Sequence, residues 1–173
     1  MNRLQTLVLA TLLSVVLCLW PWTSSQALAL PPLAALPGIS SLTGGLPPED
    51  LGVKNGQLAP CPPSPNCVVS QTADPDHQIE ALTYQGDRET ARQALLKILT
   101  IVPRTEVLEQ TDDYIRFTSS NALLGFVDDG EFYFPPDSQT IHMRSAARLG
   151  ESDLGVNRRR LEQIRLALQD LGV

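Results

Sequence analysis

Apolar residues recur with a helical period in two stretches of this chain. Between Asp87 and Val102 they fall at three- and four-residue steps, and Pro103 follows immediately. This spacing predicts an amphipathic helix over 87–102, capped by Asp87 and stopped by the proline. A second stripe predicts a closing helix over 154–171. Its apolar positions are Leu154, Leu161, Ile164, Leu168 and Leu171.

Alternating apolar and polar residues predict strands in the remaining segments. A short strand is expected at 78–84, and a hairpin is expected from strands 105–110 and 114–119. A second hairpin is expected within 125–134 and 139–149, around the turn sequence PPDSQ. The order β-α-β-β-β-β-α predicts an α+β domain, most simply an antiparallel β-sheet with two helices packed on one face.

The apolar pattern predicts the register of the second hairpin. Pairing Phe134 with Ile141 places Phe132 across from Met143, so that these apolar side chains share one face of the sheet. A shift by one residue would move all of them to the opposite face, which is why the pattern sets the register.

On the other face, the same register predicts two polar pairs. Glu131 lies across from Arg144, and Tyr133 lies across from His142. The simplest interpretation of Glu131 and Arg144 is a cross-strand ion pair, which is worth under about 1 kcal/mol if it is exposed.

An acidic residue is expected on the apolar face of the sheet. In an unbroken strand Asp128 lies there, and an unpaired carboxylate in such a place is costly. The last helix begins with consecutive arginines at 158–160, although cations are unfavourable near a helix N-terminus. We therefore expect Asp128 or Asp129 to meet one of these arginines, with Gly130 as a β-bulge that aims the acids.

The arginines could instead bind an external anion. A helix start that Ser152 and Asp153 could cap offers N–H groups, arginines add bidentate contacts, and the hydroxyls of Ser145 and Ser152 could assist. In this alternative Arg144, Arg148 and Arg158 act together with Asp128. These residues are the candidate binding arginines and acid: Arg144, Arg148, Arg158 and Asp128.

The sequence gives little support to catalysis. Ser145, His142 and an aspartate supply the nominal parts of a nucleophilic site, but no G-x-S-x-G surrounds the serine. Strand alternation points His142 and Ser145 to opposite faces, and it also separates Asp128 from Asp129. The residues therefore favour a non-catalytic protein.

The N-terminal region resembles an export signal followed by a tether. A short basic start, an apolar run and the pattern Ala27-Leu28-Ala29 predict a signal peptide over 1–29. The alternative is an uncleaved membrane anchor, the only membrane contact that we expect. Residues 30–57 are dense in Pro, Gly and Ser and predict a flexible leader, which leaves 58–173 as a single domain.

Cleavage of the signal would leave two cysteines, Cys61 and Cys67, in the sequence CPPSPNC. An exported compartment is usually oxidising, so a disulfide between them is the default interpretation. A redox-active pair and a metal site remain as alternatives. With only His77 and His142 beyond the signal, we expect neither a metal nor a cofactor.

The net charge of −6 argues against a nucleic-acid partner, because such binding depends on neutralising phosphates. The arginines are nevertheless clustered toward the C-terminus, so one site can be locally basic. We expect a monomer that acts on an unknown protein partner or a small anion.

Three motifs resemble a known family. CPPSPNC, GFVDDGEF and RSAARLGESDLGVNR, in this order, are similar to the family catalogued as domain of unknown function 1499. The resemblance spans about 58–168 and implies an export destination in the bacterial periplasm or the thylakoid lumen. It adds no reaction. The motifs also contain the residues that we predict as a candidate binding network: Asp128, Asp129, Glu131, Arg144, Ser145, Arg148, Ser152, Asp153, Asn157 and Arg158.

Overall fold

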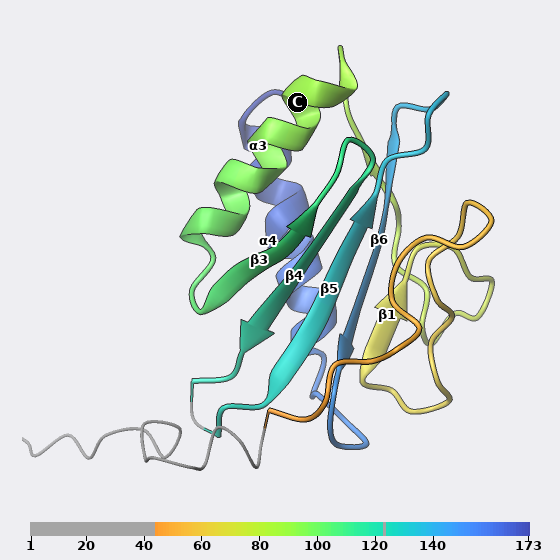
Figure 1. Cartoon of the computed structure of the whole chain (residues 1–173), viewed down its shortest axis with the longest axis vertical. Helices are drawn as coiled ribbons and strands as arrows, with labels where there is room; N and C mark the ends of the chain where they lie inside the picture. Colours follow the sequence, from red (N-terminus) through yellow and green to blue (C-terminus); the bar gives the residue numbers. More distant parts are fainter. Residues whose placement is uncertain (1–43, 123) are drawn as a thin grey trace, which may run out of the picture. The chain divides into compact units, whose positions relative to one another are not determined.

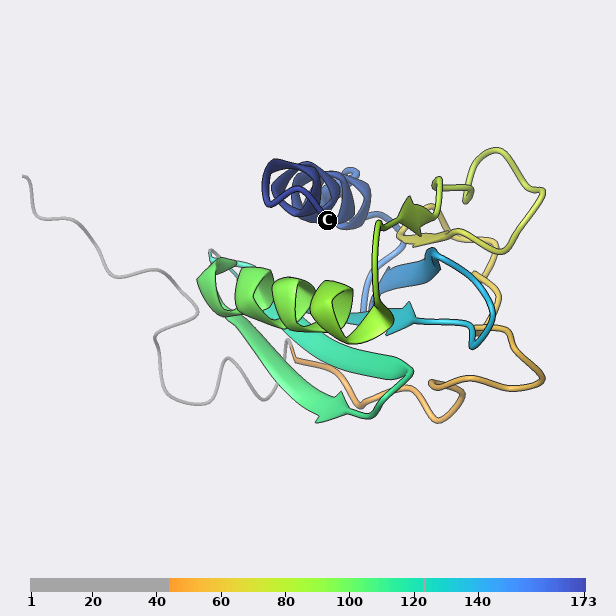
Figure 2. The ribbon, with the colours of Figure 1, turned by 90° about the horizontal axis from the view of Figure 1, so that it is seen from above.

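A six-stranded antiparallel sheet carries both helices of the described residues on one face (Figures 1 and 2). The computed structural model describes residues 44–122 and 124–173. The strand order is β1-β6-β5-β4-β3, and β2 also pairs with β6. This is the predicted α+β fold. The elements are β1 (Cys67–Val69), β2 (Leu82–Thr83), α3 (Arg88–Ile101), β3 (Thr105–Gln110), β4 (Tyr114–Ser120), β5 (Val127–Tyr133), β6 (Thr140–Ala147) and α4 (Val156–Asp170).

Helix α3 forms where its pattern predicts it. The Asp87 carboxylate accepts the backbone N–H of Thr90 at 2.9 Å and caps the first turn. Its buried side chains pack on the sheet at helical spacing, and the helix ends two residues before Pro103. The buried positions are Ala91, Leu95, Ile98 and Leu99.

Helix α4 begins two residues later than predicted. The Asp153 carboxylate accepts the N–H of Gly155 at 2.9 Å and of Asn157 at 2.7 Å, so the helix starts only after this turn. Leu154 therefore lies in the turn with a φ of 54° and is 84% exposed. Its assignment to the apolar stripe was wrong. Leu171 is also exposed, because the helix has ended before it, whereas the three central stripe residues are buried.

The predicted register of the second hairpin is confirmed. Phe132 pairs with Met143, Glu131 with Arg144, and Tyr133 with His142. Gly130 keeps this register on both sides, so the expected bulge is absent from β5. A side chain at Gly130 would instead collide with a ring of β4, which explains the glycine without any bulge.

The sequence did not predict strand β1. Cys67–Val69 forms β1, which pairs with β6 so that Cys67 lies opposite Ala146. Three residues are too few to show an alternating pattern. The strand brings the cysteine loop beside the arginine-bearing strand β6.

The two faces of the sheet have different covers. The main core lies between the sheet and the helices, and Phe117, Phe132 and Met143 are among its fully buried side chains. On the opposite face a smaller cluster contains Tyr114, Tyr133, Val69 and Leu58.

Part of the predicted leader covers this second face. Val53 packs against the smaller cluster, and Gly52 hydrogen-bonds to a side chain of β5. In Figure 2 the segment that contains them runs along the side of the sheet opposite the helices. The described part of the leader, 44–57, thus contacts the sheet around Gly52 and Val53. The remainder of the leader and the predicted signal peptide lie outside the described residues.

Strand β3 is the last strand of the sheet beyond β4. A bulge between Val107 and Glu109 interrupts its pairing with β4. Within the described ranges, no helix combines the length and the apolar character needed to cross a membrane.

Candidate functional site

Asp128 meets Arg160 on the helix-covered face. Strand β5 points Asp128 toward α4, and Arg160 Nη2 donates to Asp128 Oδ2 at 2.6 Å. The expected contact between an acid of β5 and an arginine of the last helix is thereby confirmed for this pair. Burial raises the pKa of Asp128, and the Arg160 guanidinium partly offsets that effect.

A chain of hydrogen bonds ties Arg160 to β6 and to the cysteine loop. Arg160 Nη1 donates to Asn157 Oδ1 at 2.9 Å, and the Ser145 hydroxyl donates to the same oxygen. Asn157 Nδ2 donates to the backbone carbonyl of Asn66 at 3.2 Å. Ser145 and Asn157 are fully buried, so they position the start of α4 rather than face solvent.

Asp129 lies on the opposite face of the sheet, between two arginines. Arg148 donates to it through Nε at 2.7 Å and Nη2 at 3.0 Å, which is a bidentate pair. Arg116 adds a longer contact at 3.4 Å. Asp129 has no exposed surface, so both of its oxygens are occupied inside the protein.

Glu131 is the centre of a second buried cluster. It accepts from Arg144 Nη1 at 3.2 Å, from the Tyr114 hydroxyl at 2.8 Å and from the Gly52 N–H at 2.7 Å. Burial and the nearby Glu131 carboxylate raise the pKa of Tyr114 well above its usual value. Glu131 is fully buried and Arg144 almost so, which corrects the interpretation of an exposed ion pair. The packed leader segment is what removes this pair from water.

Arg158 does not join the acids. Its guanidinium donates to the backbone carbonyls of Gln78 at 2.6 Å and Asp76 at 3.1 Å. Ser152 accepts the N–H of Leu154 at 3.2 Å, and Asp153 accepts the N–H groups of Gly155 and Asn157 at the start of α4, whose N-cap is Gly155. The predicted residues therefore fall into three buried acid–arginine contacts, at Asp128, Asp129 and Glu131, and a group that shapes the start of α4.

Asp128, Asp129 and Glu131 are each bound to an arginine inside the protein, so none of these three carboxylates is free to act as an acid, a base or a nucleophile. Ser145 faces α4, whereas His142 lies on the other face, where its Nδ1 is 3.2 Å from the Ser70 hydroxyl. Burial lowers the pKa of His142. Within 44–122 and 124–173, no three His, Cys, Asp or Glu side chains lie close enough together to hold a metal ion.

Cys61 and Cys67 form the disulfide that was the default interpretation for an exported chain. Cys67 is buried in β1, and its carbonyl oxygen contacts Nδ1 of the buried His77 at 3.0 Å. The disulfide therefore anchors the proline-rich loop to the edge of the sheet.

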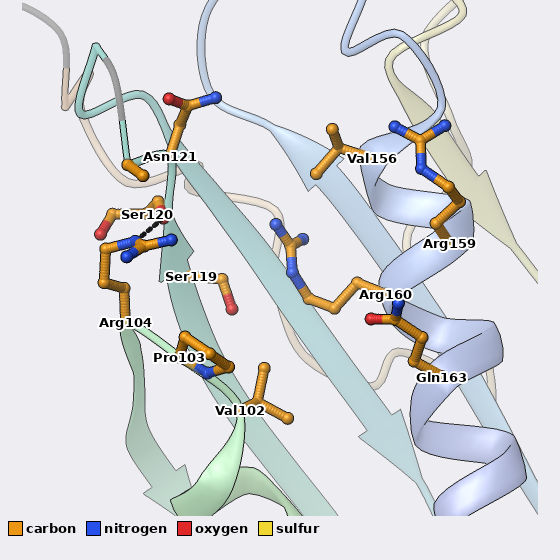
Figure 3. A pocket seen from close by; sticks show the side chains of 11 residues that line it. Val102, Pro103, Arg104, Ser119, Ser120, Asn121, Val156, Arg159, Arg160 and Gln163 are labelled. Carbon is orange, nitrogen blue, oxygen red and sulfur yellow. Dashed lines mark hydrogen bonds between the residues drawn. The ribbon is translucent and has the colours of Figure 1, made fainter. Parts of the chain in front are cut away.

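The structure contains a cleft beside α4 that the sequence did not predict. It measures about 470 Å³ and lies between the first turns of α4, the loop joining α3 to β3, and the end of β4 (Figure 3). Three arginines line it: Arg104 from the loop, and Arg159 and Arg160 from the helix. The sequence gives little indication of this cleft, because Arg104 has no other arginine near it in the sequence. The other two arginines of the cleft, Arg159 and Arg160, lie far along the chain.

Comparison with known proteins identifies one family. The family model described as "Protein of unknown function (DUF1499)" matches residues 57–168. No curated protein and no solved structure matches the chain.

Proposed function

The chain belongs to the DUF1499 family, whose model covers most of the described residues. We propose that this protein is a non-catalytic binding or assembly factor that acts after export, in a periplasm or a thylakoid lumen.

The observation that carries the non-catalytic role is the complete pairing of the acids. Asp128, Asp129 and Glu131 are all buried, and each is held by an arginine. A general base or nucleophile must reach a substrate, whereas these carboxylates are already bound inside the protein. Buried arginine–acid clusters of this kind are suited to fixing one conformation of a surface.

The same pairing argues against an anion site built from Arg144, Arg148, Arg158 and Asp128. Arg144 and Arg148 lie on the face of the sheet away from α4, while Arg158 is occupied by backbone carbonyls. These guanidinium groups do not converge on a common cleft. The proposed binding role therefore does not use them as direct ligands.

The place of action is supported by the predicted signal peptide and by the disulfide. A Cys61–Cys67 bond is expected to persist in an oxidising compartment and to be rare in the cytosol. The predicted tether would keep the domain near a membrane only if the signal remained uncleaved.

Export can be tested with the full chain fused at its C-terminus to a phosphatase reporter that is active only outside the bacterial cytoplasm. We expect reporter activity, and we expect both thiols of the domain to resist alkylation until a reductant is added. A cytoplasmic product with freely alkylated cysteines would contradict the proposed location. Deleting residues 1–29 supplies the control that should remain inside.

Absence of catalysis can be tested with the purified full chain and a metabolite extract from the compartment in which the protein resides. Mass spectrometry before and after incubation should show that molecules are retained by the protein but not converted. Conversion that is abolished in Asp128→Asn or Glu131→Gln, with each variant shown to be folded, would overturn the non-catalytic role.

A further inference from the structure

The cleft beside α4 concentrates positive charge in an otherwise acidic chain. Arg104, Arg159 and Arg160 line it, and among the described residues no acidic side chain does. The chain as a whole carries a formal charge of −6. A local basic site of this kind raises the local concentration of anions.

Two of the three guanidinium groups keep most of their donors. Arg104 Nε donates to the Ser120 carbonyl at 3.2 Å, and Arg159 Nη1 donates to the Leu154 carbonyl at 2.8 Å. Neither forms an ion pair with a described residue. Each contact fixes one end of a planar guanidinium while leaving its other N–H groups available to an oxyanion.

Arg160 differs because Asp128 already neutralises it. Asp128 and Asn157 hold Nη2 and Nη1 of this guanidinium. Arg160 thus forms a fixed wall of the cleft, and the uncompensated charge comes from Arg104 and Arg159. Figure 3 shows Arg104 on the loop side, and Arg159 and Arg160 on the helix side.

The backbone of Arg104 is strained at the position that faces the cleft. Its φ of 54° lies in the left-handed region, where a non-glycine residue costs about 1–2 kcal/mol. Reciprocal bonds with Ser120 hold it there, since the Ser120 N–H also donates to the Arg104 carbonyl at 3.0 Å. Glycine would satisfy this backbone better, so stability alone does not account for an arginine.

The N-terminus of α4 does not itself supply the site. Asp153 already accepts the N–H groups of Gly155 and Asn157. The donors that remain are the arginine side chains, together with polar groups such as Ser120 and Gln163. One wall is apolar and includes Val102, Pro103 and Val156.

The structure assigns this cleft as a binding site for an organic phosphate monoester. Two arginines without an ion-pair partner line the cleft, and their charge suits a ligand that carries nearly two negative charges near neutral pH. The cleft, at about 470 Å³, exceeds what a bare phosphate fills, and its apolar wall suits the organic part. This inference rests on the proposed binding role and names its ligand class. The phosphate could belong to a soluble ester or to the headgroup of phosphatidic acid.

The test titrates the full chain with phenyl phosphate, inorganic phosphate and phenol at constant ionic strength, using calorimetry. We expect saturable binding of phenyl phosphate, weaker binding of inorganic phosphate and none of phenol. Arg104→Gln and Arg159→Gln should each weaken phenyl phosphate binding roughly 10- to 100-fold. Lys97→Gln removes an exposed cation of α3 outside the cleft and should leave binding unchanged.

Arg104→Gly separates binding from stability. Because it relieves the strained backbone, it should unfold no more readily than wild type and still lose affinity. Absence of saturable phenyl phosphate binding, or equal affinity in wild type and the folded Arg104→Gly variant, would overturn the assignment.

Two further measurements identify the molecule that carries the phosphate and test the proposed non-catalytic role. Co-sedimentation with phosphatidylcholine vesicles containing phosphatidic acid, competed by phenyl phosphate and lost in Arg104→Gln, would identify the headgroup. Binding of phenyl phosphate without vesicle binding would identify a soluble ester.

Release of phenol from phenyl phosphate would overturn the non-catalytic role while leaving the site in place. Absence of binding alone would remove the site and leave the export and extract experiments to decide the role.

Discussion

The backbone N–H of Gly52 donates to Glu131 Oε1 at 2.7 Å, across a separation of 79 residues. This bond joins the segment before the cysteine loop to the middle of strand β5. Together with the Tyr114 hydroxyl and Arg144, it leaves Glu131 fully buried. The charge of Glu131 is therefore balanced inside the protein and not by solvent.

Glu131→Gln should lower the free energy of unfolding by about 3 kcal/mol. The amide can still accept hydrogen bonds, but it leaves the buried guanidinium of Arg144 without its counter-charge. Urea denaturation at neutral pH measures this loss. Glu106→Gln, at an exposed position of β3, is the matched control and should change stability by less than about 0.5 kcal/mol. A loss below about 1 kcal/mol for Glu131→Gln would mean that water compensates Arg144.

Gly130→Ala should destabilise the fold by about 3 kcal/mol or more. A Cβ on Gly130 would stand 2.0 Å from Cζ of Phe117, and the buried ring has little room to move. Thermal unfolding of the single variant gives the cost. The double variant Gly130→Ala/Phe117→Leu should recover part of it, since the two residues are coupled through one contact. Additive losses would show that the ring is not the cause.

The stability contribution of Asp128 should increase as the pH falls. Burial raises the pKa of this carboxyl above its ordinary value of 3.8, so the folded state binds the proton more readily than the unfolded state does. Between the raised pKa and 3.8, wild type should therefore gain stability relative to Asp128→Asn as acid is added. Denaturant titrations of both proteins at pH 7 and at pH 4.5 measure the change. If the difference in unfolding free energy between wild type and Asp128→Asn does not vary with pH, the raised pKa of Asp128 is contradicted.

Loss of the Cys61–Cys67 disulfide should cost about 2 kcal/mol, because it closes a loop of only a few residues. Unfolding of wild type with and without a phosphine reductant measures this cost. The double variant Cys61→Ala/Cys67→Ala should behave like reduced wild type and should not respond to the reductant. A much larger loss would indicate that the loop also organises the contacts of His77 and Asn66 beside it.

The pattern of apolar and polar residues predicted the helices and the central hairpin, because residues close together in the sequence determine these elements. The alternation through Phe132 and Met143 determines the register, and Asp128 follows from it as an acid that needs a partner. The partner, Arg160, was among three adjacent arginines, and helix geometry alone did not separate them. Its neighbours Arg158 and Arg159 instead bind backbone carbonyls.

The remaining features depend on contacts between segments that are distant in the sequence. The burial of Glu131 needs the segment around Gly52, and the reason for Gly130 lies in Phe117 on the next strand. The arginine-lined cleft requires the α3–β3 loop to lie beside the first turns of α4. None of these contacts leaves a periodic signal, so composition and spacing could not predict them.

The bulge at Leu108 has a consequence for the protein at high concentration. Strand β3 ends the sheet, and an unprotected edge strand is a template onto which another copy can add. The bulge breaks the even ladder of backbone donors and acceptors, and Glu106 and Glu109 add like charges along the same strand. A second β3 approaching this edge would meet an irregular backbone and electrostatic repulsion. Within the described residues, the bulge and these glutamates thus disfavour fibrous self-assembly through strand β3.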